Sequence, residues 1–456
     1  MKNRKRWRIL LLGMMCLLPA HALPVQAEEY WPEGPQIEGE TAIVMEASTG
    51  TVLYEKNSHE HSYPASITKI MTSLLAVENS NLDEEVAFSQ DAVYKTEGGS
   101  GISRDIDEVM TMRECLYGLM LESANECGYA IAEHTGGDYE NFIKMMNSKA
   151  KELGCKDTHF NNPHGLPDED HWTSPYDMAL ISKEALQNDI FRMIVNTRRY
   201  TIPPTNKHSE ETYLSNHHKM LNNYKGDEQY LYDYCIGGKT GYTSVAGSTL
   251  ATFAEKDGMT LICVVMKETS PNHYNDTRTL FDYCFENFQL WNVSENEKNY
   301  AEETPEMKIF ENEDSFIGLD TEGCVVLPVA ADFEDAVPEI TESKDDSQVI
   351  GKIEYTYAGR KVGGTDIKTT GAKVSEFEFR KNTMETKVPE KKVIRINIKY
   401  VIIGIASVIL LIGLGFGIYH LADNFYLIRY KFECRKQQKH KFKEIKSRRS
   451  WRRNRR

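Results

Sequence analysis

The 456-residue sequence contains nine cysteines but no Cys-x-x-Cys pair. Seven of the nine lie between residues 28 and 400, and an odd number cannot form a complete set of disulfides. Most have apolar neighbours, which is typical of buried free thiols, although a bridge between Cys115 and Cys127 is an alternative. The cysteine pattern therefore excludes a small disulfide-rich scaffold.

The sequence also lacks a metal-binding signature. His159, His164 and His171 cluster in one stretch, but their spacing matches neither His-Glu-x-x-His nor a zinc pattern. We interpret these histidines as residues that structure a loop, with Asp177 as a structural anchor, and we expect no metal and no cofactor.

Acidic and basic side chains are segregated along the chain, whose formal net charge is −14. Residues 1–8 carry five basic side chains and no acidic one, and residues 426–456 carry 14 Lys/Arg against two Glu, a net +12. Residues 28–400 carry 35 Lys/Arg against 65 Asp/Glu, a net −30. Because so acidic a segment cannot neutralise phosphates, we exclude nucleic acid as a partner.

Two apolar runs stand beside the basic blocks. The first precedes a small-residue cleavage motif, Val-Gln-Ala, so that residues 1–27 fit a secretory signal peptide. The second, residues 401–419, has no charged residue and would cross about 30 Å of hydrocarbon as a helix. Since basic flanks stay inside, we expect a single-pass protein of the cell membrane. Its middle would be extracytoplasmic, and residues 426–456 would form a basic cytoplasmic tail.

The hydrophobic pattern between these runs predicts an α+β fold. Two β-type runs flank a turn over residues 41–56, and a run with amphipathic helical periodicity follows Pro64. Residues 111–195 carry helix signals interrupted by a loop at 161–174. Further along, the pattern predicts strands at about 235–245, 247–255 and 259–267, then a helix at about 276–288. Acidic clusters and short β-type runs then predict a small β-rich domain and stem over residues 292–390.

A Ser-x-x-Lys motif, Ser66 to Lys69, opens the helical run after Pro64. Residues three apart lie on one face of a helix, so the Lys69 amine can reach the Ser66 hydroxyl. A serine becomes a good nucleophile when a base takes its proton, and a lysine whose pKa is lowered can be that base. Taken alone, the motif is better explained by a helix-capping Ser66 and a solvated Lys69.

Two further polar motifs interrupt apolar runs. In the first, Ser123 can relay a proton, and the amide of Asn125 can hold a lysine and a substrate carbonyl. In the second, Lys239 supplies positive charge and Thr240 a hydroxyl for an anionic group, while Gly241 leaves room for another backbone. The ordinary explanations are a polar helix joint and a strand edge with a solubilising lysine.

Together and in this order, Ser-x-x-Lys, Ser-x-Asn and Lys-Thr-Gly resemble the motif trio of penicillin-binding proteins and class A β-lactamases. The sequence is similar to the serine-type D-alanyl-D-alanine carboxypeptidases, the low-molecular-weight penicillin-binding proteins. The stretches 42–54, 162–166 and 174–177 also look like that family. The resemblance implies a penicillin-binding/β-lactamase-like catalytic domain over residues 38–290, an antiparallel sheet flanked by helices. A β-lactamase is disfavoured, because no Glu-x-x-Leu-Asn motif precedes Asp177.

The resemblance implies that Ser66 is the acylated nucleophile, Lys69 its general base and Ser123 a proton carrier. The implied substrate-binding residues are Asn125, Lys239, Thr240, Gly241 and Tyr242. Backbone N–H groups of Ser66 and Tyr242 would form the oxyanion hole. The enzyme would remove the terminal D-alanine from peptidoglycan stem peptides through an acyl-enzyme, and β-lactams would be covalent inhibitors.

Three points stay open from the sequence. A D,D-endopeptidase or weak transpeptidase on the same fold, or a penicillin sensor without turnover, is an alternative. Relatives often have an arginine near the final catalytic-domain helix for the substrate carboxylate, and here His273 and Arg278 are the candidates. Many relatives also end in an amphipathic membrane-surface helix, whereas this sequence has the spanning run 401–419.

Overall fold

The computed structural model describes residues 30–298, 316–342, 349–370, 430–436 and 439. The predicted signal peptide, the predicted transmembrane helix and most of the basic tail lie outside these ranges. Within the described ranges, no helix is both long enough and apolar enough to cross a membrane. By its contacts the chain divides into two units, Met1–Glu376 and Phe377–Arg456, and the strands of the described residues all belong to the first.

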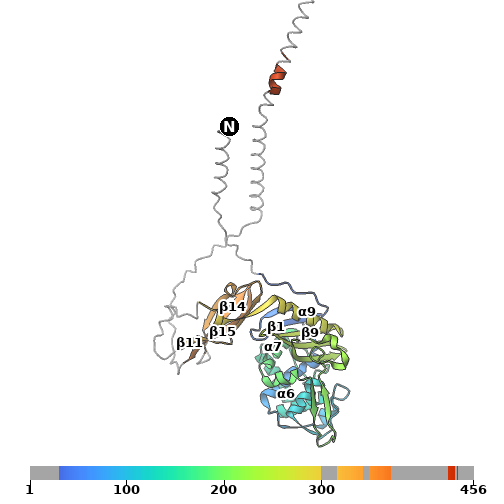
Figure 1. Cartoon of the computed structure of the whole chain (residues 1–456). Coiled ribbons are helices and arrows are strands. Elements are labelled where there is room, and N and C mark those ends of the chain that lie inside the picture. The colour runs from blue at the N-terminus through green and yellow to red at the C-terminus, as the bar shows by residue number, and fades with distance from the viewer. Residues whose placement is uncertain (1–29, 299–315, 343–348, 371–429, 437–438, 440–456) are drawn as a thin grey trace, which may run out of the picture. The chain divides into compact units, whose positions relative to one another are not determined.

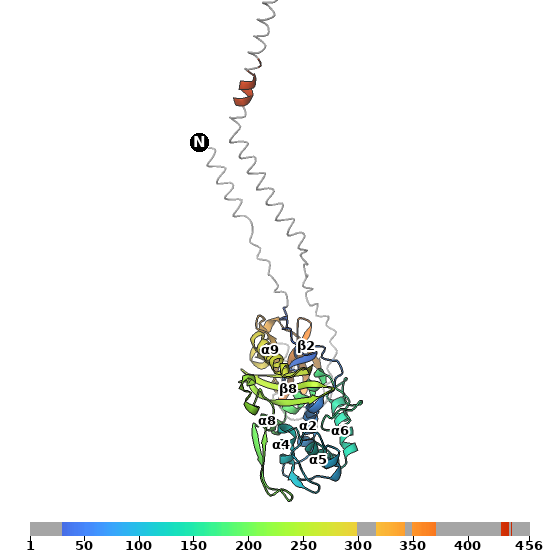
Figure 2. The ribbon, with the colours of Figure 1, turned by 90° about the vertical axis from the view of Figure 1, so that its right-hand side faces the viewer.

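A five-stranded antiparallel sheet in the order β2-β1-β9-β8-β7 is the centre of the fold (Figures 1 and 2). Its strands are β1 (Thr41–Glu46), β2 (Val52–Lys56), β7 (Cys235–Thr243), β8 (Gly247–Lys256) and β9 (Met259–Glu268). The strands predicted from the sequence are thereby confirmed to within two residues. The early strand β1 pairs with the late strand β9, with Thr41 opposite Met266.

The two faces of this sheet bury different clusters. Alternate residues of a strand point to opposite faces, so Ile43 and Met45 of β1 join one hydrophobic cluster and Ala42 and Val44 the other. The helix α9 (Asn272–Asn287) packs on the second face. It begins four residues before the predicted start at residue 276. Its first turn buries His273 and Tyr274, and the sequence pattern did not mark this turn as helical.

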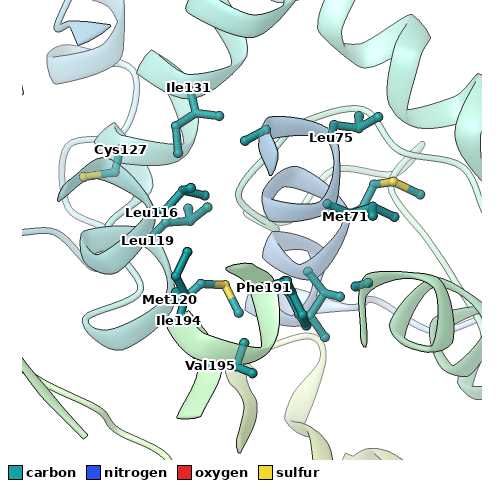
Figure 3. Close-up of a cluster of buried hydrophobic side chains, with 14 of the residues drawn as sticks. Met71, Leu75, Leu116, Leu119, Met120, Cys127, Ile131, Phe191, Ile194 and Val195 are labelled. Atoms are coloured by element: carbon teal, nitrogen blue, oxygen red, sulfur yellow. The ribbon is translucent and has the colours of Figure 1, made fainter. Parts of the chain in front are cut away.

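Helices cover the first face of the sheet. They are α2 (Lys69–Asn79), α4 (Met112–Leu121), α5 (Asn125–Gly136), α6 (Tyr139–Glu152), α7 (Pro175–Leu186) and α8 (Asp189–Asn196). Figure 3 shows side chains of several of these helices gathered in one cluster, among them Met71 and Leu116. The prediction of an amphipathic α2 was wrong, since Lys69, Thr72 and Ser73 are buried along with its apolar residues. Helices α4 to α8 surround α2, and its residues 69–76 are therefore buried on all sides.

A second antiparallel sheet follows α9, with the order β10-β12-β15-β14-β13 and β11 paired to β15. Its strands are β10 (Phe288–Asn292), β11 (Phe316–Leu319), β12 (Cys324–Pro328), β13 (Val337–Glu342), β14 (Val349–Tyr357) and β15 (Arg360–Thr370). Val325, Leu327 and Ile353 belong to its own hydrophobic cluster. The predicted β-strands of this region are therefore confirmed within the described residues. That residues 292–390 form a separate domain remains a prediction.

The cysteines in the described ranges are free thiols, as expected. Cys115 and Cys127 are fully buried and not bridged, although their side chains hydrogen-bond to each other.

Candidate active site

Ser66 and Lys69 are separated by one turn of 3-10 helix. The helical run after Pro64 begins with η1 (Ala65–Thr68), and α2 starts at Lys69. Side chains three apart are eclipsed in this geometry, and Lys69 Nζ lies 3.0 Å from Ser66 Oγ. Ser66 is only half-buried, but Lys69 is completely inaccessible to solvent. The interpretation of Lys69 as a solvated lysine is therefore wrong.

The Lys69 amine has two further partners. It donates to Asn125 Oδ1 at 2.7 Å and to the carbonyl oxygen of His164 at 2.5 Å. Burial, followed by the positive charge of Lys239, lowers the pKa of Lys69 well below its ordinary value, although Glu126 acts in the opposite direction. The amine can therefore lose its proton far more easily than a lysine in water.

The Ser-x-Asn motif lies at the junction between α4 and α5. Ser123 has a left-handed backbone, with φ of 61°, and Asn125 is the first residue of α5. The Ser123 hydroxyl is buried, and within the described part of the chain it has no hydrogen-bond partner. It is thus available to a substrate or to a proton in transfer.

The Lys-Thr-Gly motif lies on β7, at the edge of the central sheet. A Cβ added to Gly241 would come within 2.7 Å of the Ser66 backbone nitrogen, so β7 approaches η1 at the position where a side chain is missing. Thr240 is half-buried, and Tyr242 is 70% exposed. The predicted close backbone approach at Gly241 is confirmed.

Lys239 does not solubilise a strand edge, because only 1% of it is exposed. Its amine donates to the Thr240 carbonyl oxygen at 2.9 Å. Burial lowers the pKa of Lys239 to about 7, against the opposing negative charge of Glu122. At neutral pH the amine is therefore divided between its charged and neutral forms.

The loop 161–174 forms one wall of the site and is organised by its histidines. His171 Nδ1 accepts the Asn161 N–H at 2.9 Å, and its Nε2 lies 2.9 Å from Thr68 Oγ1, next to Lys69. Burial lowers the pKa of His171 to about 3, so the ring is neutral. The loop-structuring interpretation is confirmed for His171. In the described ranges, no group of three or more His, Cys, Asp or Glu side chains is arranged to hold a metal.

The loop is tied at its two flanks and along its backbone. Asp177, expected as an anchor, accepts hydrogen bonds from the Asp157 N–H at 2.6 Å and the Thr158 hydroxyl at 2.7 Å. Gly165 has φ of 87°, and a Cβ there would lie 1.8 Å from the Ala65 carbonyl oxygen. The loop backbone therefore rests directly on η1.

The two candidates for a carboxylate-binding group differ in their surroundings. Arg278 donates to the carbonyl oxygens of Gln229 and Leu231 at 3.3 and 2.8 Å, and its guanidinium lies over the Tyr232 ring. These contacts engage Arg278 in holding the segment before β7. His273 is buried, and burial lowers its pKa to about 4, so it is neutral at physiological pH.

The sequence did not reveal two members of the site. The His164 carbonyl is a backbone group, which no residue type can signal. Glu126 follows Asn125 directly, and its only signal was an acidic residue at the start of an otherwise apolar run.

Comparison with known proteins agrees with this geometry. The family model described as D-alanyl-D-alanine carboxypeptidase matches residues 28–270. D-alanyl-D-alanine carboxypeptidase DacF of Bacillus subtilis is 33% identical over 376 residues, which cover 80% of this chain and 91% of that protein. DacA of Escherichia coli K12 is 27% identical over 379 residues, covering 78% and 89%. The crystal structure of the Streptomyces K15 DD-transpeptidase matches with a TM-score of 0.51 and 29% identity, covering 56% of this chain and 99% of that one.

Fold and site define a serine-type acyl-transfer enzyme of the penicillin-binding class, with an α+β catalytic fold. The chain belongs to the D-alanyl-D-alanine carboxypeptidase family. The resemblance drawn from the three motifs is thereby confirmed.

Proposed function

We propose that the protein is a serine-type D-alanyl-D-alanine carboxypeptidase that removes the terminal D-alanine from peptidoglycan stem peptides. The observation that carries the proposal is the fully buried Lys69 amine, 3.0 Å from the hydroxyl of a more accessible Ser66. A buried lysine with a lowered pKa can accept a proton near neutral pH. Membership of the family supports the substrate class.

In the acylation step, Ser66 Oγ attacks the carbonyl carbon of the penultimate residue, and Lys69 takes the hydroxyl proton. A neutral amine has two N–H groups and one lone pair. Asn125 Oδ1 and the His164 carbonyl are placed to accept the two N–H groups, which leaves the lone pair for Ser66 Oγ. These two acceptors therefore orient the base.

The leaving D-alanine nitrogen needs a proton as its C–N bond breaks. Ser123 would pass this proton on from Lys69, while Lys239 and Thr240 would bind the terminal carboxylate. Backbone N–H groups of Ser66 and Tyr242 would stabilise the oxyanion. Water then attacks the ester, releases the shortened peptide and restores Ser66. β-Lactams would acylate the same hydroxyl and act as covalent inhibitors.

A D,D-transpeptidase or endopeptidase is a second candidate, because a matching solved structure is named a DD-transpeptidase. The activities differ in whether water or an amine resolves the acyl-enzyme, and a penicillin sensor would stop at that stage. We expect many D-alanines per molecule from diacetyl-L-Lys-D-Ala-D-Ala, and none from Ser66→Ala. Release that requires an added amine would favour the transpeptidase, and labelling by fluorescent penicillin without turnover would favour the sensor.

The proposed site of action is the outer face of the cell membrane. The signal peptide 1–27, the anchor 401–419 and the basic tail 426–456 would place the catalytic region outside and the tail inside. The charge segregation of the sequence supports this arrangement. Protease added to intact cells should remove the catalytic region and leave the anchored tail. A catalytic region protected until the cells are lysed would contradict the topology.

A further inference from the structure

A glycine-containing segment, residues 99–103, lies directly against the Ser-x-Asn motif. The Asn125 N–H donates to the Ser100 carbonyl oxygen at 2.8 Å. A Cβ added to Gly99 would lie 2.2 Å from Asn125 Nδ2, so no side chain fits at that position. Residues 99–103 therefore pack against the side-chain amide of Asn125, whose Oδ1 accepts a hydrogen bond from Lys69.

One buried side chain, Glu126 at the start of α5, holds this segment. Only 6% of Glu126 is exposed, and its Oε1 accepts the Ile102 N–H at 2.6 Å and the Ser103 N–H at 3.0 Å. The other oxygen, Oε2, lies where a Cβ on Gly101 would come within 2.7 Å. Both backbone hydrogen bonds thus depend on a single carboxylate oxygen.

The charge of Glu126 acts on the site as well. A buried carboxylate is costly unless it is paired, yet in the described ranges Glu126 forms no ion pair. Its negative charge raises the pKa of Lys69, whereas the positive charge of Lys239 lowers it. The titratable groups that face Lys69 from the surrounding elements are Lys239, Glu126, Cys127, His164 and His171.

We propose that Glu126 is a positioning residue of the active site: its carboxylate holds residues 99–103 against Asn125 and offsets the charge of Lys239 around Lys69. The inference rests on the proposed role of Lys69 as the general base. The two effects of Glu126 can be separated. Its hydrogen bonds need one acceptor oxygen, which a glutamine amide retains, but its electrostatic effect needs the negative charge, which glutamine lacks. Alanine lacks both.

The test compares Glu126→Gln and Glu126→Ala in the full-length protein, with the rate of acylation by fluorescent penicillin followed against pH. Acylation needs a neutral Lys69, so its rate rises as pH passes through the pKa of Lys69. Both variants lose the negative charge, and we expect the rising limb to move to lower pH in both. Glu126→Ala should also lose about tenfold or more of its maximal rate, because Asn125 is no longer supported. Glu126→Gln should retain it.

A second pair of variants tests the segment without touching the charge. Gly99→Ala should lower acylation at every pH and leave the rising limb where it is. Gly98→Ala is the control on the same segment. Its φ of 83° makes any side chain strained, but a Cβ there meets nothing within 4 Å, so this variant should lose stability and keep its acylation rate. Glu46→Ala controls for the loss of a buried carboxylate that caps backbone N–H groups, in this case those of Ser48 and Thr49. It should lower the melting temperature and leave the pH profile unchanged.

An unshifted rising limb in Glu126→Gln, or a maximal rate in Glu126→Ala equal to that of the parent, would overturn the inference. Ser66→Ala, measured in parallel, separates this failure from that of the proposed function. If Ser66→Ala is inactive and the Glu126 variants behave as the parent, only the role of Glu126 is lost. If Ser66→Ala is still acylated, the proposed function itself fails.

Discussion

Lys69 of α2 and Lys239 of β7 are both buried, and the positive charge of Lys239 lowers the pKa of Lys69. Two ammonium groups cannot both be well stabilised in a site of low dielectric. Lys239, with a pKa of about 7, keeps part of its charge at neutral pH. The pair can therefore divide its tasks, with Lys69 as the neutral base and Lys239 as the cation that binds a carboxylate.

The first prediction concerns the pH dependence of peptide hydrolysis. We expect kcat/KM to rise as Lys69 loses its proton and to fall again near pH 7 and above, as Lys239 loses its own. A peptide ending in D-alanine amide is the control. Without a carboxylate to attract, it should show the rising limb and lack the falling one. A carboxylate substrate with no falling limb up to pH 9 would contradict the assignment of Lys239.

Replacement of Lys239 by methionine should affect both parts of the profile. The loss of its positive charge raises the pKa of Lys69, so the rising limb should move to higher pH. The loss of a charged hydrogen bond to the substrate carboxylate should lower kcat/KM about tenfold to hundredfold. The measurement is D-alanine release over pH 5–9. A rising limb that stays in place would show that Lys239 does not act on Lys69.

Asn125→Asp should keep Lys69 protonated, so that the amine is present but cannot act as a base. The new carboxylate would stand where an oxygen now lies 2.7 Å from Lys69 Nζ, and an anion at that distance raises the pKa of the amine. A protonated Lys69 cannot take the Ser66 proton, so we expect acylation at pH 7 to fall about 10²- to 10⁴-fold. Partial recovery at high pH would identify the cause. Asn141→Asp, at an exposed position on α6, loses only a hydrogen bond from Asn141 Nδ2 to the Gly136 carbonyl and should leave acylation unchanged.

The glycine at position 165 offers a test of the loop wall. Gly165→Ala would drive a Cβ to within 1.8 Å of the Ala65 carbonyl, so η1 must move and acylation of Ser66 should fall at least tenfold. Gly258→Ala is the matched control, because it has a similar positive φ but open space around it. It should cost about 1–2 kcal/mol of folding free energy and leave the acylation rate unchanged. Equal activity of the two variants would show that the loop does not support the nucleophile.

The sequence predicted the strands of the central sheet and three motifs of the site, because both depend on local patterns. The hairpin turn Lys256-Asp257-Gly258 marked β8 and β9, and the three-residue spacing brought Ser66 and Lys69 together. The 3-10 geometry of η1 and the full enclosure of α2 were not predicted. They result from packing against β7 and the neighbouring helices, which no single segment encodes.

The remaining site groups could not be predicted for a related reason. The acceptor at His164 is a carbonyl, which every residue carries, and its position depends on how the loop 161–174 rests on η1. The charge state of Lys239 depends on its burial, and a strand-edge lysine looks the same in the sequence whether it is buried or exposed. The sequence motifs thus identified the side chains of the site, but their burial and their hydrogen-bond partners depend on the tertiary structure.

The pairing of β1 with β9 has a consequence for the order in which a ribosome makes this protein. Strand β1 can pair with β2 soon after both are made, but its second neighbour, β9, follows more than two hundred residues later, since Thr41 pairs with Met266. Nascent chains that stop before residue 259 should contain Ser66 and Lys69 yet fail to capture penicillin. We therefore expect penicillin capture to begin only when β9 has been made, because β9 joins β1 to the rest of the sheet.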